Sequence, residues 1–121
     1  MSKFAIREVN TGVKFDLKAA NGQVILTSGV YSTRAACLNG ISSTRKNAPI
    51  AGVENRMEGD HAAVTNPRFE LYQDKSGKFR FRLRARNGEI IGFSEGYATK
   101  TGCLNGVESV RKNAPGAEME E

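Results

Sequence analysis

The sequence has no tryptophan, one histidine, two cysteines and three prolines, and it has no long apolar run. A membrane-spanning helix needs about 18 consecutive apolar residues, and no stretch of the chain approaches that number. The first residues, MSKFAIREVN, also lack the apolar core of a signal peptide. We therefore expect a soluble, cytoplasmic protein with no membrane segment.

Motifs for catalysis are missing as well. The single histidine, His61, has only Asp60 beside it, whereas a general base or a metal ion needs several partners at fixed spacing. Nucleophile-elbow and zincin motifs are absent. The segment 96–103 fails the phosphate-loop pattern, because five residues separate its glycines and cysteine replaces the required lysine. The sequence predicts no catalytic residue, no metal, no cofactor and no enzyme activity.

The composition is that of a folded globular chain with a moderate positive charge. Hydrophobic residues make up 39% and charged residues 26%, close to globular averages. The formal net charge is +5, and the sequence pI is about 9.5. This charge favours an anionic partner only weakly, because many proteins with a similar charge bind no polyanion.

The chain contains an internal duplication. When residues 21–49 are aligned with residues 87–115, 16 of the 29 positions are identical. We assign residues 1–55 to the first repeat, 56–67 to a linker and 68–121 to the second repeat. A repeat of this size is marginal as an independent core, so we expect both repeats to form one compact domain.

Each repeat shows three predicted strands followed by one predicted helix. The second repeat alternates apolar and polar residues over 69–74 and 79–85, and a third apolar segment covers 89–94. The pairs Asn21-Gly22 and Asn87-Gly88 predict hairpins with type I′ turns. After Tyr31 and Tyr97 the apolar period changes to that of a helix, which Asn-Ala-Pro ends in both repeats.

The helical period defines the core positions of both predicted helices. These positions are Cys37, Ile41, Thr44 and Ala48 in the first repeat, and Cys103, Val107, Val110 and Ala114 in the second. The two cysteines are therefore expected to be small buried thiols rather than a disulfide. Ser32 or Thr33 can cap the first helix, and Thr99 can cap the second.

These elements predict an α+β fold built from tandem β-β-β-α repeats with pseudo-twofold symmetry. Two three-stranded sheets, with their helices, join into one object in which an antiparallel sheet is backed by two helices. We expect a monomer that is an intramolecular pseudo-dimer.

The repeated motifs resemble those of a known family. Both repeats contain Asn-Gly, then Ser and Tyr, then Cys-Leu-Asn-Gly-(Ile/Val), and finally Arg-Lys-Asn-Ala-Pro. This pattern resembles the YegP-like family of small bacterial proteins. The resemblance implies β3-α units combined into one sheet, a form similar to the double-stranded-RNA-binding domain, and a short strand exchanged between units after each helix, here 51–55 and 117–120. It implies no particular activity.

An arginine row is the most suggestive candidate site. Arg80, Arg82 and Arg84 alternate with apolar residues on a predicted strand, with Arg86 just beyond them and Tyr72 expected on the neighbouring strand. Cations beside an aromatic ring can follow a phosphate backbone and stack a base. The alternative is that the row is the solvated face of an antiparallel sheet.

The first repeat weakens the functional interpretation of this row. Its equivalent residues are Lys14, Asp16, Lys18 and Ala20. Each predicted helix also begins with one basic residue rather than with the basic cluster that RNA-binding domains use. A similarity of fold does not by itself identify a site.

Glycine inside both helices is the second candidate feature. Asn39-Gly40 and Asn105-Gly106 occupy equivalent helical positions, where each glycine costs about 1 kcal/mol relative to alanine. Close approach of another backbone is the usual reason for such a glycine. We expect packing within the chain, with docking of an external partner as the alternative.

The predicted function is that of a small non-enzymatic binding or interaction protein whose partner the sequence does not identify. The alternative is a nucleic-acid-binding protein that uses the arginine-rich sheet face.

Overall fold

The computed structural model describes residues 1–57 and 63–120. The first repeat contains β1 (Lys3–Val9), β2 (Gly12–Lys18), β3 (Val24–Ser28), α1 (Arg34–Asn47), a short 3-10 helix η1 (Ala48–Ile50) and β4 (Gly52–Asn55). The second repeat contains β5 (Arg68–Gln73), β6 (Phe79–Arg84), β7 (Ile90–Phe93), α2 (Lys100–Asn113) and β8 (Glu118–Glu120). The predicted order of three strands and a helix is confirmed in both repeats.

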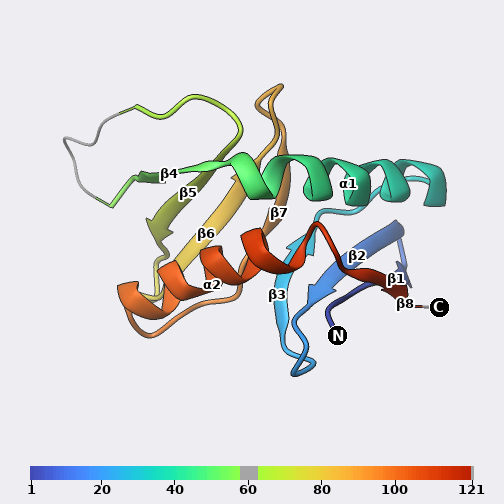
Figure 1. The fold of residues 1–121 in the computed structure, drawn as a ribbon, viewed down its shortest axis with the longest axis horizontal. Helices are drawn as coiled ribbons and strands as arrows, with labels where there is room; N and C mark the ends of the chain where they lie inside the picture. The colour runs from blue at the N-terminus through green and yellow to red at the C-terminus, as the bar shows by residue number, and fades with distance from the viewer. Residues whose placement is uncertain (58–62, 121) are drawn as a thin grey trace.

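All eight strands form one sheet in the order β4-β5-β6-β7-β3-β2-β1-β8 (Figure 1). The repeats meet at its centre, where β3 pairs antiparallel with β7. At the edges, β4 of the first repeat pairs with β5 of the second, and β8 of the second pairs with β1 of the first. The exchanged strands are therefore confirmed.

The sheet is not wholly antiparallel, because both edge pairs are parallel. Each edge strand follows a helix and runs opposite to the strand before that helix, and this direction makes it parallel to the first strand of the other repeat, beside which it lies. The predicted pseudo-twofold pairing therefore yields one mixed sheet, in which the six central strands are antiparallel.

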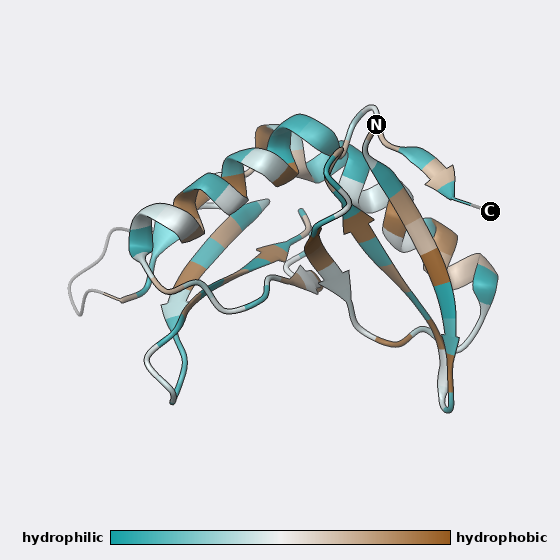
Figure 2. Ribbon diagram, turned by 90° about the horizontal axis from the view of Figure 1, so that it is seen from below, coloured by the Kyte–Doolittle hydropathy of each residue, from teal (hydrophilic) through white to brown (hydrophobic). Residues whose placement is uncertain are grey.

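Both helices lie on the same face of the sheet (Figures 1 and 2). Each helix crosses the joint between the repeats, since α1 contacts β2 and β7 while α2 contacts β6 and β3. Every predicted core position of the two helices is buried. Four phenylalanines of the strands, Phe4, Phe15, Phe69 and Phe81, are fully buried beneath the helices. The two repeats thus share a single core.

The helix ends bond one repeat to the other. Arg45 in the last turn of α1 donates from Nη1 to the carbonyl of Pro115 at 3.3 Å. Arg111 in the last turn of α2 donates from Nε to the carbonyl of Ala51 at 3.2 Å. Each guanidinium also lies over the first phenylalanine of its own repeat. Basic residues in the last turn of a helix favour its C-terminus, and here they also hold the segments that lead into the exchanged strands.

The Asn-Gly hairpins form, but the predicted type I′ turn is wrong. Gly22 and Gly88 have φ of 85° and 88°, whereas no non-glycine residue in the described part of the chain has positive φ. In the first hairpin, Gly22 N donates to Ala19 O at 2.9 Å, and Ala19 N donates to Gln23 O at 2.9 Å. Such a loop is a type I turn followed by a left-handed glycine. Asn21 keeps negative φ, and its Oδ1 accepts from Gln23 N.

Candidate binding surfaces

The sheet face opposite the helices carries one row of side chains that crosses all eight strands. Residues directly opposite each other in neighbouring strands share a face. By register, the row runs Glu54, Glu70, Arg82, Phe93, Thr27, Asp16, Ala5, Glu120. The pseudo-twofold axis passes between Phe93 and Thr27. The two halves of this open face can therefore be compared position by position.

A fully buried carboxylate lies at the centre of the second repeat's half. Glu70 has no exposed surface. Its carboxylate accepts from Arg82 Nε at 2.6 Å, Arg84 Nε at 2.8 Å, Arg68 Nε at 2.8 Å and Arg56 Nη1 at 3.0 Å. We call Glu70, Glu54 and these four arginines the arginine cluster; Glu54 contacts Arg56 and Arg68. Four positive and two negative charges leave the cluster with a net charge of +2.

These hydrogen bonds keep Glu70 ionised. Burial raises the pKa of the carboxyl, but hydrogen bonds from Arg82, Arg68 and Arg84 outweigh that effect and lower the pKa to about 2. In return, the carboxylate fixes the positions of guanidinium groups whose side chains keep 20–38% of their surface exposed.

The four arginines of the predicted row do not form a single site, because they have different partners. Arg82 and Arg84 belong to the arginine cluster, and the guanidinium of Arg82 lies 4.9 Å from the ring centroid of Tyr72. Arg80 instead donates from Nε to Asp74 at 2.7 Å, and this hydrogen bond lowers the pKa of that carboxyl. Arg86 is exposed and lies beyond the end of β6. The arginines of β6 are therefore not a row of free cations on a solvated face.

Sequence reasoning missed five residues of this face, which are Glu54, Arg56, Arg68, Glu70 and Phe93. The alternation over 69–74 predicts that the Glu70 side chain points away from the core. It does so, but guanidinium groups cover its carboxylate. Arg56 lies in the assigned linker, and β4 brings it beside β5. Local alternation carries no signal for either contact, because both depend on strand pairing.

The first repeat's half of the open face is different. Ala5 takes the place of Glu70, and Asp16 takes the place of Arg82. Asp16 accepts from Arg7 Nε at 2.9 Å and from the Thr27 hydroxyl at 2.9 Å. Lys18 pairs with an acidic residue of β8 at 3.1 Å. In each of these two pairs the carboxylate has one basic partner, whereas Glu70 accepts from four arginines.

The helical glycines pack against tyrosines. A Cβ added at Gly40 would lie 2.2 Å from the Tyr31 hydroxyl oxygen, and one at Gly106 would lie 2.3 Å from that of Tyr97. Packing within the chain is confirmed, but the expected approach of another backbone is wrong. Each tyrosine is bridged to the second strand of its repeat and stacks on a core phenylalanine, which brings its ring under the helix.

The two helix asparagines are on the outer side of this contact. Asn39 and Asn105 are exposed. Neither side chain forms a hydrogen bond with another residue in the described ranges 1–57 and 63–120. Their neighbours Gly40 and Gly106 therefore have a packing role, whereas the asparagines have none.

Both cysteines are fully buried free thiols. Burial raises the pKa of Cys103 to about 11, and it also raises the pKa of Cys37, where nearby Arg34 opposes it. A raised pKa disfavours the reactive thiolate. His61 and Asp60 lie outside the described residues. Within those residues, no three His, Cys, Asp or Glu side chains are grouped to hold a metal ion, and neither helix is long and apolar enough to cross a membrane.

Comparison with known proteins identifies the repeats. A family model described as a domain of unknown function, DUF1508, matches residues 9–55 and again 74–121. The UPF0339 protein PA0329 of Pseudomonas aeruginosa is 35% identical over 121 residues, which cover 99% of this chain and 96% of that protein. A UPF0339 protein of Treponema denticola is 63% identical over 54 residues, which cover 45% of this chain and 93% of the relative. That relative has about the length of one repeat.

Two solved structures show the same fold. The solution structure of the Escherichia coli protein yegP, described as a protein of unknown function, matches with a TM-score of 0.80 and 32% identity, covering 98% of this chain and 90% of that one. The UPF0339 protein SO3888 of Shewanella oneidensis matches with a TM-score of 0.80 and 31% identity, over 98% of this chain and 89% of that one.

Proposed function

This chain belongs to the YegP-like family of small repeat proteins, and from that premise we propose that it is a non-enzymatic binding protein whose arginine cluster holds an acidic segment of a partner protein. The observation that carries this proposal is the net charge of +2 around a buried carboxylate on an open sheet face. Arginine binds carboxylates well because its planar fork offers several donors in fixed geometry.

The cluster leaves donors available to a ligand. Within the described residues, Arg82 donates only from Nε, so both of its Nη groups are unpartnered. The Tyr72 ring supports this guanidinium from one side. Glu70 already fixes the Arg82 side chain. When a ligand carboxylate binds, this side chain therefore loses less conformational entropy than a free arginine side chain would.

The extent of the charge favours a short anionic segment. The cluster is confined to β4, β5 and β6 and the residue after β4, and neighbouring strands are about 4.8 Å apart. A longer polyanion crossing the sheet would meet Asp16 and Glu120 on the other half. An acidic peptide segment can stay within the arginine cluster.

The buried thiols support a role without catalysis. Cys37 and Cys103, the strongest nucleophiles among the described side chains, have raised pKa values and no exposed surface.

Single-stranded nucleic acid is the second candidate, and exposed aromatic rings favour it. Phe93 is 39% exposed and lies directly beside Arg82 in the sheet. Tyr72 lies on the other side of the same guanidinium. Two rings flanking an arginine can stack bases while the arginine contacts phosphate.

The test is a fluorescence titration of the full chain with two probes, a hexaglutamate peptide and a 12-nucleotide single-stranded RNA, over a range of salt concentrations. We expect the peptide to bind and the variant Arg82→Gln/Arg84→Gln to weaken its binding about tenfold or more. The charge-matched control Lys46→Gln/Lys100→Gln, which changes exposed helix residues, should leave the affinity unchanged. Arg82→Lys keeps the charge but loses the fork, so it should also weaken binding.

Equal binding by the cluster variant and the control would overturn the proposal. Tighter binding of RNA that persists at physiological salt, and that falls about tenfold in Tyr72→Leu, would favour the nucleic-acid candidate instead. Circular dichroism of each variant shows whether the fold is retained.

A further inference from the structure

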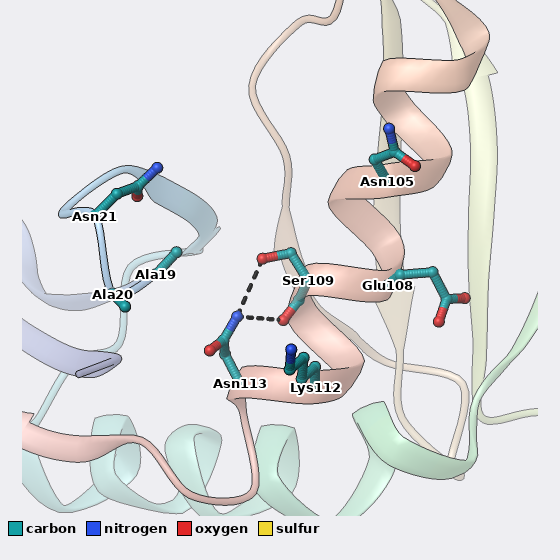
Figure 3. A pocket seen from close by; sticks show the side chains of 8 residues that line it. All are labelled: Ala19, Ala20, Asn21, Asn105, Glu108, Ser109, Lys112 and Asn113. Carbon is teal, nitrogen blue, oxygen red and sulfur yellow. Dashed lines mark hydrogen bonds between the residues drawn. The ribbon is translucent and has the colours of Figure 1, made fainter.

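Two grooves lie on the helix side of the molecule, where the hairpin loop of one repeat faces the helix of the other. The first, of about 470 Å³, lies between residues 19–21 and α2 (Figure 3). The second, of about 180 Å³, lies between the β6–β7 hairpin and α1. They are related by the pseudo-twofold axis and are independent of the arginine cluster.

Three polar positions are shared by the two grooves, namely one asparagine of the hairpin and an asparagine and a serine of the helix. The first groove contains Asn21, Asn105 and Ser109. The second contains Asn87 and the helix residues equivalent to these, an asparagine and a serine. Some exposed helix positions outside the grooves differ between the copies, for example arginine and lysine, then alanine and threonine, at the first two residues of each helix, whereas the exposed leucine before each helix asparagine is the same.

Many residues shared by the repeats have a structural role, but the helix asparagines and the leucines before them do not. The hairpin glycines, the tyrosines, the N-cap threonines and the helix arginines all serve turns, packing or caps. Asn39 and Asn105 are exposed and form no hydrogen bond with other described residues. The preceding leucines, Leu38 and Leu104, are 41% and 36% exposed. Asparagine is a poor helix former, so its presence at both sites is not explained by folding.

Besides the charged groups of Glu108 and Lys112, the first groove contains neutral amide donors and acceptors. Asn113 uses its Nδ2 to donate to Ser109 O at 2.8 Å and Oγ at 3.1 Å, and its oxygen points toward the hairpin (Figure 3). Asn21 uses its Oδ1 to accept from Gln23 N, which leaves its Nδ2 available. The Asn105 amide is free to donate and accept. Opposite walls of the groove thus present both halves of the amide hydrogen-bonding pattern.

We propose that each groove binds an extended polypeptide segment of a partner protein. The asparagine amides would pair with its backbone N–H and C=O groups, and the exposed leucine beside each helix asparagine would contact one apolar side chain. The charged groups near the two grooves differ, with Glu108 and Lys112 in the first and Glu89 in the second. A ligand common to both must therefore be recognised through the neutral groups, and a peptide backbone is neutral.

Because the two grooves are related by the pseudo-twofold axis, we expect two peptide-binding sites in each chain. One chain offers two equivalent sites, so a short peptide binds twice. A partner that carries two copies of the segment gains affinity from the second contact without any new chemistry.

The experiment selects ligands from a random 12-residue peptide phage library on the full chain and titrates one selected peptide by calorimetry and ¹H–¹⁵N NMR. We expect a stoichiometry near two and shifts of the side-chain amide signals of Asn39 and Asn105. Asn105→Ala should remove one site and Asn39→Ala the other, each losing about tenfold or more in affinity at its own groove. The double variant should bind neither peptide copy.

These variants also separate binding from stability. Alanine is the better helix former, so Asn39→Ala and Asn105→Ala should melt at the same or a higher temperature than the parent chain. The control Arg34→Ala/Lys100→Ala changes exposed residues at the helix starts and should bind as the parent does. A lower melting temperature in the asparagine variants would assign these residues a structural role and overturn the proposal.

Three further outcomes would overturn it. The library could yield no binder, the selected peptide could bind the asparagine double variant as well as the parent chain, or it could shift only signals of the open sheet face. A parallel titration with maltotriose and adenosine covers the other neutral ligands. Shifts at the two asparagines with either compound, and none with the peptide, would assign the grooves to that ligand class.

Discussion

The two repeats share their helix side and differ on their open sheet face. On the helix side, each repeat has the same tyrosine under the same glycine, the same capping threonine and the same arginine bonded to the other repeat. On the open face, Glu70 with its arginines corresponds to Ala5 beside Asp16. The helix-side contacts recur in both halves of the molecule, whereas the contacts that Arg56 and Arg82 make with Glu70 on the open face have no counterpart in the other half. The open face can therefore differ between the repeats while the joint stays symmetric.

Separating the repeats tests the shared part of this comparison and should have the largest effect. Residues 1–57 and 63–121 each lack the exchanged strand that covers their edge. We expect neither fragment to fold as a monomer, and an equimolar mixture to restore the native spectrum, because each repeat is marginal alone. NMR and sedimentation measure this. A well-dispersed spectrum from a monomeric fragment would show that the core is not shared.

The next prediction concerns the half of the open face that has the buried carboxylate. Glu70→Ala leaves four guanidinium groups without their common partner, so we expect a loss of about 3 kcal/mol of unfolding free energy. Asp16→Ala, the matched change in the first repeat, removes a carboxylate paired with an arginine whose side chain is 51% exposed, and should cost about 1 kcal/mol. Urea denaturation of both variants gives the two values. Equal losses would mean that the open faces differ in composition but not in energetics.

Acid titration independently measures how much the Glu70 carboxylate contributes to the free energy of unfolding. The folded-state pKa of Glu70 is lowered to about 2 from an ordinary value of 4.5. Its stabilisation is therefore complete above about pH 4.5 and is lost as the pH falls toward 2. In Glu70→Gln the unfolding free energy should fall less over this interval than in the parent chain. Parallel curves for the two proteins would contradict the lowered pKa.

The helical glycines should behave alike, with a smaller difference between the repeats. Gly40→Leu and Gly106→Leu should each cost about 1–3 kcal/mol, because the new side chain displaces a tyrosine. Gly106 should be the more sensitive position, since its Cβ would also lie 3.1 Å from Phe81. Thermal melts of the two variants test both statements, and a higher melting temperature for either variant would show that nothing packs there.

Thiol labelling should give the smallest difference between the repeats. Cys37 and Cys103 are both buried, so both should resist a maleimide in the native protein and react after denaturation. Burial raises both pKa values, but Arg34 opposes the increase only at Cys37. We therefore expect Cys37 to react faster during native-state opening. Mass spectrometry of time points resolves the order, and rapid labelling of either native thiol would place that helix face outside the core.

The amino-acid sequence alone determined the elements and their buried faces. The alternation around Phe81 and the helical spacing around Val107 identify core residues, because side-chain direction follows from the period of the element itself. Thr99 could be identified as a cap for the same reason, since the bond joins residues three apart. Such signals need no knowledge of which strands are neighbours.

The tertiary structure decided the contacts that depend on pairing. The burial of Glu70 requires Arg56 to arrive from the residue after β4, and the position of Tyr31 under Gly40 requires a bridge from the end of one strand to another. Asn21 also takes a different turn from the one its Asn-Gly pair predicted. Local periodicity is the same for every register of a strand, so only the folded sheet determined that four arginines surround one carboxylate in one repeat and that alanine occupies its place in the other.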